Sequence, residues 1–182
     1  MEKIILTKGQ AVNLTKETNG ASLFEFRAGW DTSLAGNADV DIMAGQVKER
    51  NELVYYANMS SADASIKLSG DNRTGEGDGW DETIYIDFSK VDSTTTKVPV
   101  FVSIYNAQEQ GLNFGLIRNL QVQIYDVTNG QVVGEFMPEL ENSLSTAMLL
   151  GEFVKSGASF FFKTLGTGYD KVQDIIAEYK LG

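Results

Sequence analysis

The chain has 182 residues, enough for one domain with a sizeable hydrophobic core, and its 42% aliphatic and aromatic content is typical of soluble globular proteins. It contains no cysteine and no histidine, which excludes disulfides, thiolate and imidazole metal sites, His-based triads and Cys–His pairs. The net charge of −10 makes nucleic acid a poor partner, because nucleic-acid binding depends on lysine and arginine neutralising phosphates.

Short strands dominate the expected secondary structure. Residues 22–30 and 82–88 alternate between apolar and polar side chains, which is typical of strands with one buried face. Residues 98–105 are almost continuously apolar, which predicts a strand that is buried on both faces.

Two β-hairpins are expected in the second half of the chain. The dipeptide Asn129-Gly130 marks a tight turn between two strand-like segments. A second hairpin covers residues 147–165 and is predicted to turn at Ser156-Gly157.

A helix is predicted near the C-terminus, and a weaker helical pattern covers residues 108–113. The apolar side chains of the C-terminal segment fall on one helical stripe: Tyr169, Val172, Ile175, Ile176 and Tyr179. Together these elements predict a mainly β fold, a β-sandwich of antiparallel strands with a few short helices and a C-terminal helix. We expect one domain over residues 1–182.

The sequence offers no uninterrupted apolar run near the ~18 residues of a transmembrane helix, so we expect no direct membrane insertion. At the N-terminus the only apolar run is IIL, which is too short for the core of a signal peptide. These observations predict a cytoplasmic protein.

Negative charge is concentrated in two distant stretches of the chain. Residues 71–87 carry a net charge of −5 and residues 20–45 a net charge of −3. The densest part is residues 70–82, GDNRTGEGDGWDE, with four glycines and five carboxylates. Because repulsion between like charges favours spreading them, we expect something to neutralise both stretches at once.

Four interpretations of residues 70–82 are open. A solvated loop is the commonest role for such a composition, but it accounts poorly for so many neighbouring acids. A phosphate cradle usually has a lysine, and this segment has none. A glycosidase-like pair of acids, with Trp30 and Trp80 as sugar platforms, needs a scaffold more rigid than a glycine-rich loop.

The fourth interpretation is a Ca²⁺ site. Calcium takes about six to eight oxygen ligands in flexible geometry, and glycines let the chain fold around the ion. The segment departs from an EF-hand loop at Arg73 and Gly75. Its candidate ligands are Asp71, Asn72, Glu76, Asp78, Asp81 and Glu82.

Residues 70–82 closely resemble the signature of the TerD-type tellurite-resistance family, which includes bacterial stress-response proteins. Residues 6–17 look like the N-terminal strand pair of that family. Further segments resemble family motifs in the same order along the chain: 28–31, 37–44, 53–61, 104–107, 113–119, 146–153 and 166–169.

The resemblance implies a β-sandwich that binds Ca²⁺ and is not an enzyme. It implies that Asp31, Asp39 and Asp41 join the acidic loop as ligands of one or two ions. The expected role is in stress response or tellurite resistance through contacts with other proteins, such as family members or membrane-associated resistance proteins. The alternative is a structural or scaffold subunit with an architectural or partly lost metal site.

Three residues depart from the family pattern. Met43, Trp80 and Asn106 stand where the family usually has aspartates, and each removes one negative charge. Removing negative charge from the ligands lowers the affinity for Ca²⁺. The chain is therefore expected to bind one ion, or two ions more weakly than a typical member. Trp30 and Trp80 are expected to pack as lids or core beside the candidate ligands.

Overall fold

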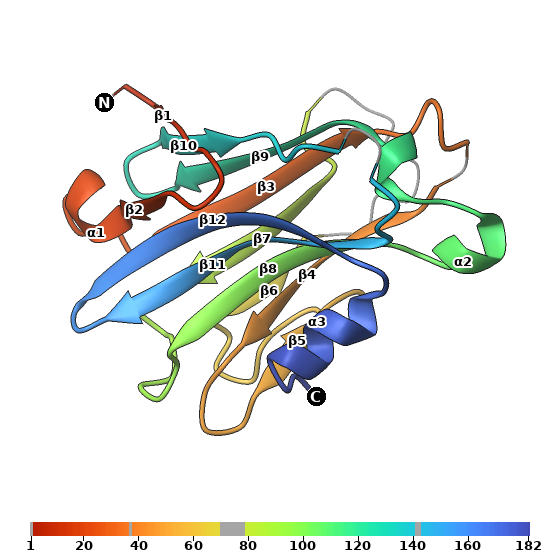
Figure 1. Cartoon of the computed structure of the whole chain (residues 1–182). Coiled ribbons are helices and arrows are strands. Elements are labelled where there is room, and N and C mark those ends of the chain that lie inside the picture. Colours follow the sequence, from red (N-terminus) through yellow and green to blue (C-terminus); the bar gives the residue numbers. More distant parts are fainter. Residues whose placement is uncertain (1, 37, 70–78, 141–142) are drawn as a thin grey trace.

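The computed structural model describes residues 2–36, 38–69, 79–140 and 143–182, which form two six-stranded sheets packed face to face (Figure 1). We call them sheet A and sheet B. Sheet A has the strand order β1 (Ile4–Ile5), β10 (Gln131–Phe136), β9 (Arg118–Asp126), β3 (Leu23–Asp31), β7 (Glu82–Asp87), β6 (Ile66–Leu68). Its neighbouring strands are antiparallel except for β1 and β10.

Sheet B is antiparallel throughout. Its strand order is β2 (Ala11–Asn13), β12 (Ser159–Tyr169), β11 (Ala147–Ser156), β8 (Lys97–Ile104), β4 (Val40–Gln46), β5 (Glu52–Val54). The helical segments are α1 (Leu14–Glu17), α2 (Ala107–Gln110), the 3-10 helix η1 (Phe114–Leu116) and α3 (Val172–Glu178). The predicted β-sandwich with a C-terminal helix is therefore confirmed.

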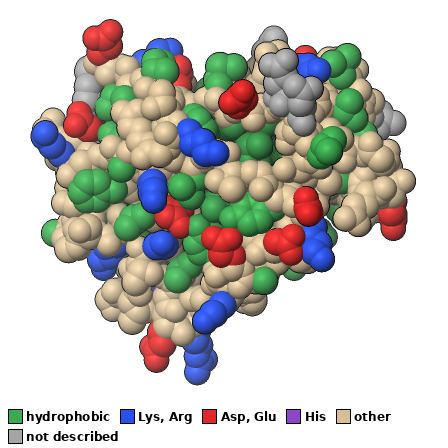
Figure 2. Space-filling view, viewed as in Figure 1, with side chains coloured by type: hydrophobic (Ala, Val, Ile, Leu, Met, Phe, Trp, Pro, Cys, Tyr) green, Lys and Arg blue, Asp and Glu red, His purple; other side chains and the backbone are tan. Residues whose placement is uncertain are grey.

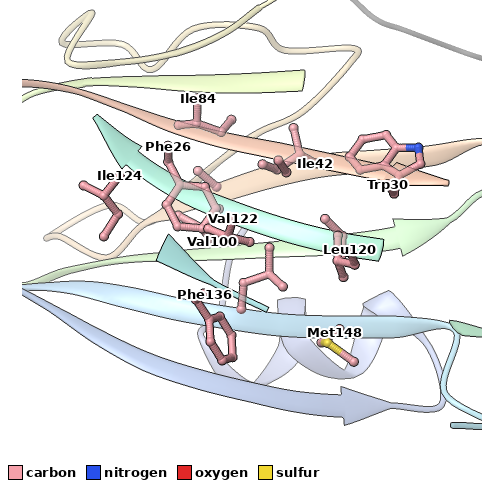
Figure 3. Close-up of a cluster of buried hydrophobic side chains, with 14 of the residues drawn as sticks. Phe26, Trp30, Ile42, Ile84, Val100, Leu120, Val122, Ile124, Phe136 and Met148 are labelled. Atoms are coloured by element: carbon pink, nitrogen blue, oxygen red, sulfur yellow. The ribbon is translucent and has the colours of Figure 1, made fainter. Parts of the chain in front are cut away.

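The main core lies between the two sheets (Figure 3). Phe26 and Val122 of sheet A face Val100 of sheet B, and all three side chains are buried. The ring of Phe26 meets those of Phe153 and Phe162 from sheet B, with centroids 6.0 and 5.5 Å apart. Such aromatic contacts add to the burial of apolar area and fix how the two sheets are seated.

Most local predictions agree with the structure. Ile84 and Ile86 of β7 point into the core, whereas Tyr85 between them is exposed. Strand β8 is buried along nearly its whole length, as its continuous apolar sequence predicts. The hairpin at Asn129-Gly130 joins β9 to β10 with Gly130 at a φ of 65°, a left-handed conformation that glycine adopts readily.

Four local features differ from the prediction. The second hairpin turns one residue later, so that Ser156 pairs with Ser159. The weaker helical pattern begins at Ala107, and Tyr169 ends β12 instead of starting the C-terminal helix. The segment expected as an N-terminal strand pair contains β2 followed by α1, because the side chain of Asn13 accepts a bond from the Lys16 N–H and starts a helix.

A second, smaller core covers the outer face of sheet B beneath α3. Its buried members are Met43, Phe101, Ala147, Leu149, Ile175 and Leu181. Gly45 makes room for this packing, since a Cβ atom there would lie 2.6 Å from the Leu181 side chain. Figure 1 shows α3 in front of sheet B, and Figure 2 shows hydrophobic side chains near the middle of this side with charged side chains around them.

The outer face of sheet A carries a row of paired polar side chains. Arg27 donates to the Glu25 carboxylate at 2.6 Å and to the side-chain carbonyl of Gln123 at 3.0 Å. The side-chain amide of Gln123 in turn donates to Glu135 at 3.0 Å. Lys3 donates to the other carboxylate oxygen of Glu135 at 2.7 Å. This face is held by hydrogen bonds and ion pairs between strands.

The described part of the chain contains no helix that is long and apolar enough to cross a membrane.

Candidate metal centre

Three acidic segments meet at one end of the sandwich. Strand β3 ends at Asp31 where its antiparallel neighbour β7 begins at Glu82, with Ala28 opposite Glu82. Ser69, which precedes the acidic loop, donates its N–H to Thr83 at 2.8 Å. Both flanks of the loop are thus fixed at this end, while the candidate ligands Asp71, Asn72, Glu76 and Asp78 lie outside the described residues.

Asp81 is tied to the end of β3. Its N–H donates to the Ala28 carbonyl at 3.0 Å, and its carboxylate accepts the Trp30 N–H at 2.8 Å. Burial raises the pKa of Asp81, although the bond from Trp30 opposes this shift. The raised pKa means that the ionised form of Asp81 is disfavoured here, and a nearby cation would stabilise it.

The two tryptophans pack as predicted. The Trp30 side chain is buried at the edge of the main core (Figure 3). Trp80 is half-buried and lies over Gly29, where a Cβ atom would be 3.4 Å from the Trp80 ring. Trp80 and the Asp81 carboxylate therefore lie side by side over Gly29, whereas the Trp30 indole faces the main core.

Glu82 connects the two sheets. Its side chain is 2% exposed, and its carboxylate accepts the Ile42 N–H of β4 at 2.8 Å. Strand β5 pairs with β4 only from Ala44 to Gln46, so Ile42 lies beyond the reach of that strand. The carboxylate of Glu82 takes the place of a missing strand partner.

The Asp31 side chain is held by the turn that follows β3. Its carboxylate accepts the Ser33 N–H at 2.8 Å, and this bond lowers the pKa of Asp31. Arg118 lies opposite Asp31 in the β3–β9 register and contributes a smaller lowering of the same pKa. Asp31 therefore stays ionised at the end of β3.

Asp39 and Asp41 approach the same end along β4. Val40 and Ile42 belong to the main core, so Asp41 projects from the opposite face, the outer face of sheet B. Asp41 is only 7% exposed, and the backbone carbonyl of Asp39 accepts the Tyr105 N–H at 2.7 Å. The β4 acids therefore enter the acidic end from a different direction than Glu82.

The described acids are carboxylates, the ligand type that a hard cation prefers, but they do not form a complete site by themselves. No group of three acids close enough to hold a metal occurs within the described ranges. Asp39, Asp41, Asp81 and Glu82 all have interaction partners. A carboxylate that accepts one backbone N–H can still offer its second oxygen to a cation, so the chemistry of these described donors is compatible with Ca²⁺.

Residues 2–179 match the family model of the TerD domain. The chain belongs to the TerD domain family. Among its relatives, the tellurium resistance protein TerD of Serratia marcescens is 31% identical over 91% of both chains. The general stress protein 16U and the uncharacterized protein YceE, both of Bacillus subtilis (strain 168), are each 32% identical, again over 91% of both chains.

Solved structures share the TerD fold. The unknown function protein SAV2460 is 27% identical and superposes with a TM-score of 0.70, covering 87% of this chain and 95% of its own. A homologue of the telluride resistance protein TerD from Streptomyces coelicolor A3(2) has a TM-score of 0.69, covering 87% of this chain and 96% of its own. The second is 20% identical and supports the fold alone.

One departure from the TerD pattern has a structural account. Met43 is buried on the outer face of sheet B, in the small core with Phe101 and Ile175. An aspartate at this place would face apolar side chains, so the methionine is used for packing.

A cavity that the sequence did not predict lies beside the second, smaller core. Its lining includes Asp41 together with Tyr55, Tyr56 and Tyr105. The adjacent tyrosines at the end of β5 are a visible signal, but the sequence does not show that Tyr105 and Asp41 lie in the same cavity. Asn106, another departure from the family pattern, lines it as well.

Proposed function

We propose that this TerD-family protein is a non-enzymatic Ca²⁺-binding protein of the tellurite-resistance or stress-response type, which acts through contacts with other proteins. The observation that supports the proposal most is that three strand ends that carry acids lie together at one end of the sandwich. The β3 end, the β4 start and the β7 start all arrive where the flanks of the acidic loop are fixed.

The ligands in this proposal are drawn from the loop and from the strand ends. The candidates are Asp71, Asn72, Glu76, Asp78, Asp81, Glu82, Asp31, Asp39 and Asp41. A bound Ca²⁺ supplies positive charge that offsets the repulsion between these acids and holds the loop against β3 and β4. The raised pKa of Asp81 supports this role, because a cation favours the ionised carboxylate.

The absence of histidine and cysteine supports a role other than catalysis. An enzyme built from these residues would need carboxylate and metal chemistry alone. We therefore propose that other proteins recognise a surface of this protein whose shape depends on the bound ion. A hydrolase screen with Mg²⁺ and Ca²⁺ that detected turnover would overturn this part of the proposal.

Thermal melting tests Ca²⁺ binding directly. Ligand at 100 times its Kd stabilises a protein by about 2.7 kcal/mol, which for a domain of this size raises Tm by roughly 5–10 °C. We expect that rise on adding Ca²⁺, and its reversal by EDTA. Equal melting curves in Ca²⁺ and EDTA would contradict the proposal.

A double variant localises the effect. Asp78→Ala combined with Asp81→Ala should abolish saturable Ca²⁺ uptake in calorimetry. The matched control is Asp170→Ala combined with Asp174→Ala, which removes one exposed acid just before α3 and one within it and should leave Ca²⁺ uptake unchanged. Equal loss in both variants would point to general electrostatics instead of a site.

The packing of Met43 favours a second candidate, a scaffold subunit with an architectural or partly lost metal site. Its neutral side chain occupies the small core where the family pattern has an acid. Light scattering would distinguish the two candidates. A stable oligomer or stoichiometric complex of equal mass in Ca²⁺ and EDTA would favour the scaffold.

A further inference from the structure

A cavity of 480 Å³ lies on the outer face of sheet B. Its walls come mainly from four places in the chain: β4, the end of β5, the connection from β8 into α2, and the start of α3. Ligand-binding pockets commonly have volumes of roughly 300–1,000 Å³ and mix apolar walls with a few polar groups. The cavity has the size and the lining of such a pocket.

Tyrosines stand on two sides of the cavity floor. Tyr55 and Tyr56 follow β5, Tyr105 follows β8, and these two strands pair with opposite edges of β4. Neighbouring strands lie roughly 4.8 Å apart, so the backbones that carry the two tyrosine walls are separated by about 9–10 Å. Because carbon atoms make contact at about 3.5–4 Å, one ring held between two walls needs roughly 7–8 Å. The cavity therefore has room for a single ring between its tyrosines.

These tyrosines offer aromatic surface for a ligand to cover. Tyr56 is 50% exposed and Tyr105 is 48% exposed. The rings of Tyr55 and Tyr56 meet nearly at right angles, with centroids 5.1 Å apart and an interplanar angle of 77°, so Tyr55 supports its neighbour. Burial of an aromatic face against apolar C–H groups is favourable, and the rigid ring loses little conformational entropy.

Amide side chains lie at the opening of the cavity on two sides. Asn106 and Gln108 are at the start of α2, Gln173 is on α3, and all three are exposed. The Asn106 side chain makes no capping bond to α2, and its φ of 49° is a left-handed conformation in which asparagine is enriched. An amide both donates and accepts hydrogen bonds, as a hydroxyl group does. The opening therefore suits a ligand that carries several hydroxyl groups.

The exposed charges at the cavity balance each other. Among the described lining residues, Glu109 and Lys171 are the exposed charged ones, and their charges are opposite. The rim thus favours neither an anion nor a cation. Asp41 also lines the cavity, but it is buried, has an interaction of its own and is a candidate ligand of the proposed Ca²⁺ site. We therefore leave Asp41 out of the recognition.

The walls are fixed before any ligand arrives. The Tyr105 N–H donates to the Asp39 carbonyl at 2.7 Å, and the Tyr105 carbonyl accepts the Gln110 side-chain amide at 3.3 Å. The Tyr55–Asn58 turn is closed by backbone bonds of 3.0 and 2.9 Å in the two directions. A pre-formed site loses little entropy on binding, which favours recognition of a small ligand.

We propose that this cavity is a binding site for a neutral pyranose sugar of the glucose type. The hydroxyl groups of such a ring are equatorial, so the C–H bonds leave both of its faces apolar. These faces contact Tyr56 and Tyr105, while the hydroxyls around the ring edge bond to Asn106, Gln108 and Gln173. The site does not rest on the proposed Ca²⁺ function, and it is tested without Ca²⁺.

A flat heterocycle such as a nucleobase is the main rival ligand. It would stack on the same tyrosines, but its polar atoms occupy only part of its edge. The amides at the opening lie on two sides, so one side would face carbon atoms of the heterocycle. Hydroxyl groups surround a pyranose ring and can reach both sides.

The test titrates methyl β-D-glucopyranoside and sorbitol into the full chain in EDTA, followed by NMR. Both molecules are neutral and rich in hydroxyls, but open-chain sorbitol has no ring face. We expect saturable shifts with the glucoside and roughly tenfold weaker affinity for sorbitol. Equal affinities would overturn the proposal, as would no saturable binding of the glucoside. A failure of Ca²⁺ to stabilise the protein would leave this result unaffected.

Adenosine, titrated in the same way, distinguishes the heterocycle from the sugar. We expect it to bind more weakly than the glucoside. Tighter binding of adenosine would overturn the sugar assignment in favour of a flat heterocycle.

Three variants locate the site. Tyr105→Phe keeps the aromatic face and should retain glucoside binding, whereas Tyr105→Leu should weaken it about three- to tenfold. Gln108→Ala removes one amide and should weaken binding by a similar factor, about three- to tenfold. The control Tyr85→Leu removes an exposed tyrosine on the outer face of sheet A and should have no effect. Near-UV circular dichroism verifies that each variant is folded, and equal losses in the Tyr85 and Tyr105 variants would contradict the assignment.

Discussion

The outer faces of the two sheets are stabilised in opposite ways. Sheet A leaves its outer face to solvent and lines it with side chains that bond across strands, from Arg27 through Gln123 to Glu135. Sheet B buries part of its outer face under α3, with Phe101 and Ile175 fully enclosed. The difference follows the sequence pattern, because strands that alternate can face water and strands that are apolar on both sides need a cover.

The outer faces of the two sheets also differ in the kind of interaction that stabilises them. On sheet A the interactions are hydrogen bonds and ion pairs near solvent, which contribute little each and respond to acid. On sheet B they are apolar contacts with a few buried polar bonds at the rim, and each contact removed there costs more. Three variants test whether this contrast holds.

The largest effect is expected from Ile175→Ala. Ile175 is fully buried beneath α3, and its truncation should lower the free energy of unfolding by about 2–5 kcal/mol, measured by urea denaturation. The control Gln173→Ala changes an exposed side chain on the same helix and should alter stability by less than about 0.5 kcal/mol. Similar values for the two variants would mean that α3 is not held by the small core.

An intermediate effect is expected from Tyr179→Phe. The Tyr179 hydroxyl donates to the buried carboxylate of Glu152, and the variant should cost about 1.5 kcal/mol at neutral pH. Burial and the bond to Glu152 raise the pKa of Tyr179 above its ordinary value. The folded state therefore keeps this proton when the unfolded chain has lost it, so the contribution of Tyr179 is present below about pH 10 and declines above it.

Urea denaturation across pH 8–11 measures this decline. The wild-type chain should lose stability above about pH 10 more steeply than the Tyr179→Phe chain. Burial and the bond to Glu178 also raise the pKa of Tyr169 to about 12, so some alkaline sensitivity remains in the variant. Parallel pH profiles would contradict the role assigned to Tyr179.

The smallest effect is expected on sheet A, from Glu135→Gln. The bond from Lys3 lowers the pKa of Glu135, so the contribution of this carboxylate is present above its unfolded pKa and is lost as pH falls through the folded pKa. Because the pair is partly exposed, we expect a loss of about 0.5 kcal/mol at pH 7 and no difference below about pH 3. Acid titration of stability measures this convergence, with Glu49→Gln, an exposed carboxylate, as the control. A loss that persists at low pH would show packing instead of charge at this position.

Much of the fold could be predicted because its signals are local. Alternation placed Ile84 and Ile86 in the core, and Asn129-Gly130 fixed a hairpin. The stripe of the C-terminal helix correctly identified Ile175 as buried. The N-terminal segment was mispredicted because Asn13 caps a helix of a single turn, a weak signal beside the neighbouring strand pattern.

The acidic end was harder to predict, because its geometry depends on distant parts of the chain. Charge and resemblance indicated that Asp81 and Glu82 lie near Asp31, and the β3–β7 pairing brings these segments together. No local pattern could show that Glu82 bonds to the backbone of β4. Nor could the alternation in β4 alone show that Asp41 shares a cavity with Tyr105, since this depends on how α2 and α3 close over the sheet.

The bond from Ile42 to Glu82 has a consequence for the solubility of the protein. Residues 40–44 are largely apolar, and β5 covers the edge of β4 only from Ala44 onward. An uncovered edge of this kind is a template on which another chain can add a strand and begin to aggregate. Because Glu82 occupies the Ile42 N–H with a charged group, we expect this acid, one of the proposed Ca²⁺ ligands, also to hinder strand addition at this edge.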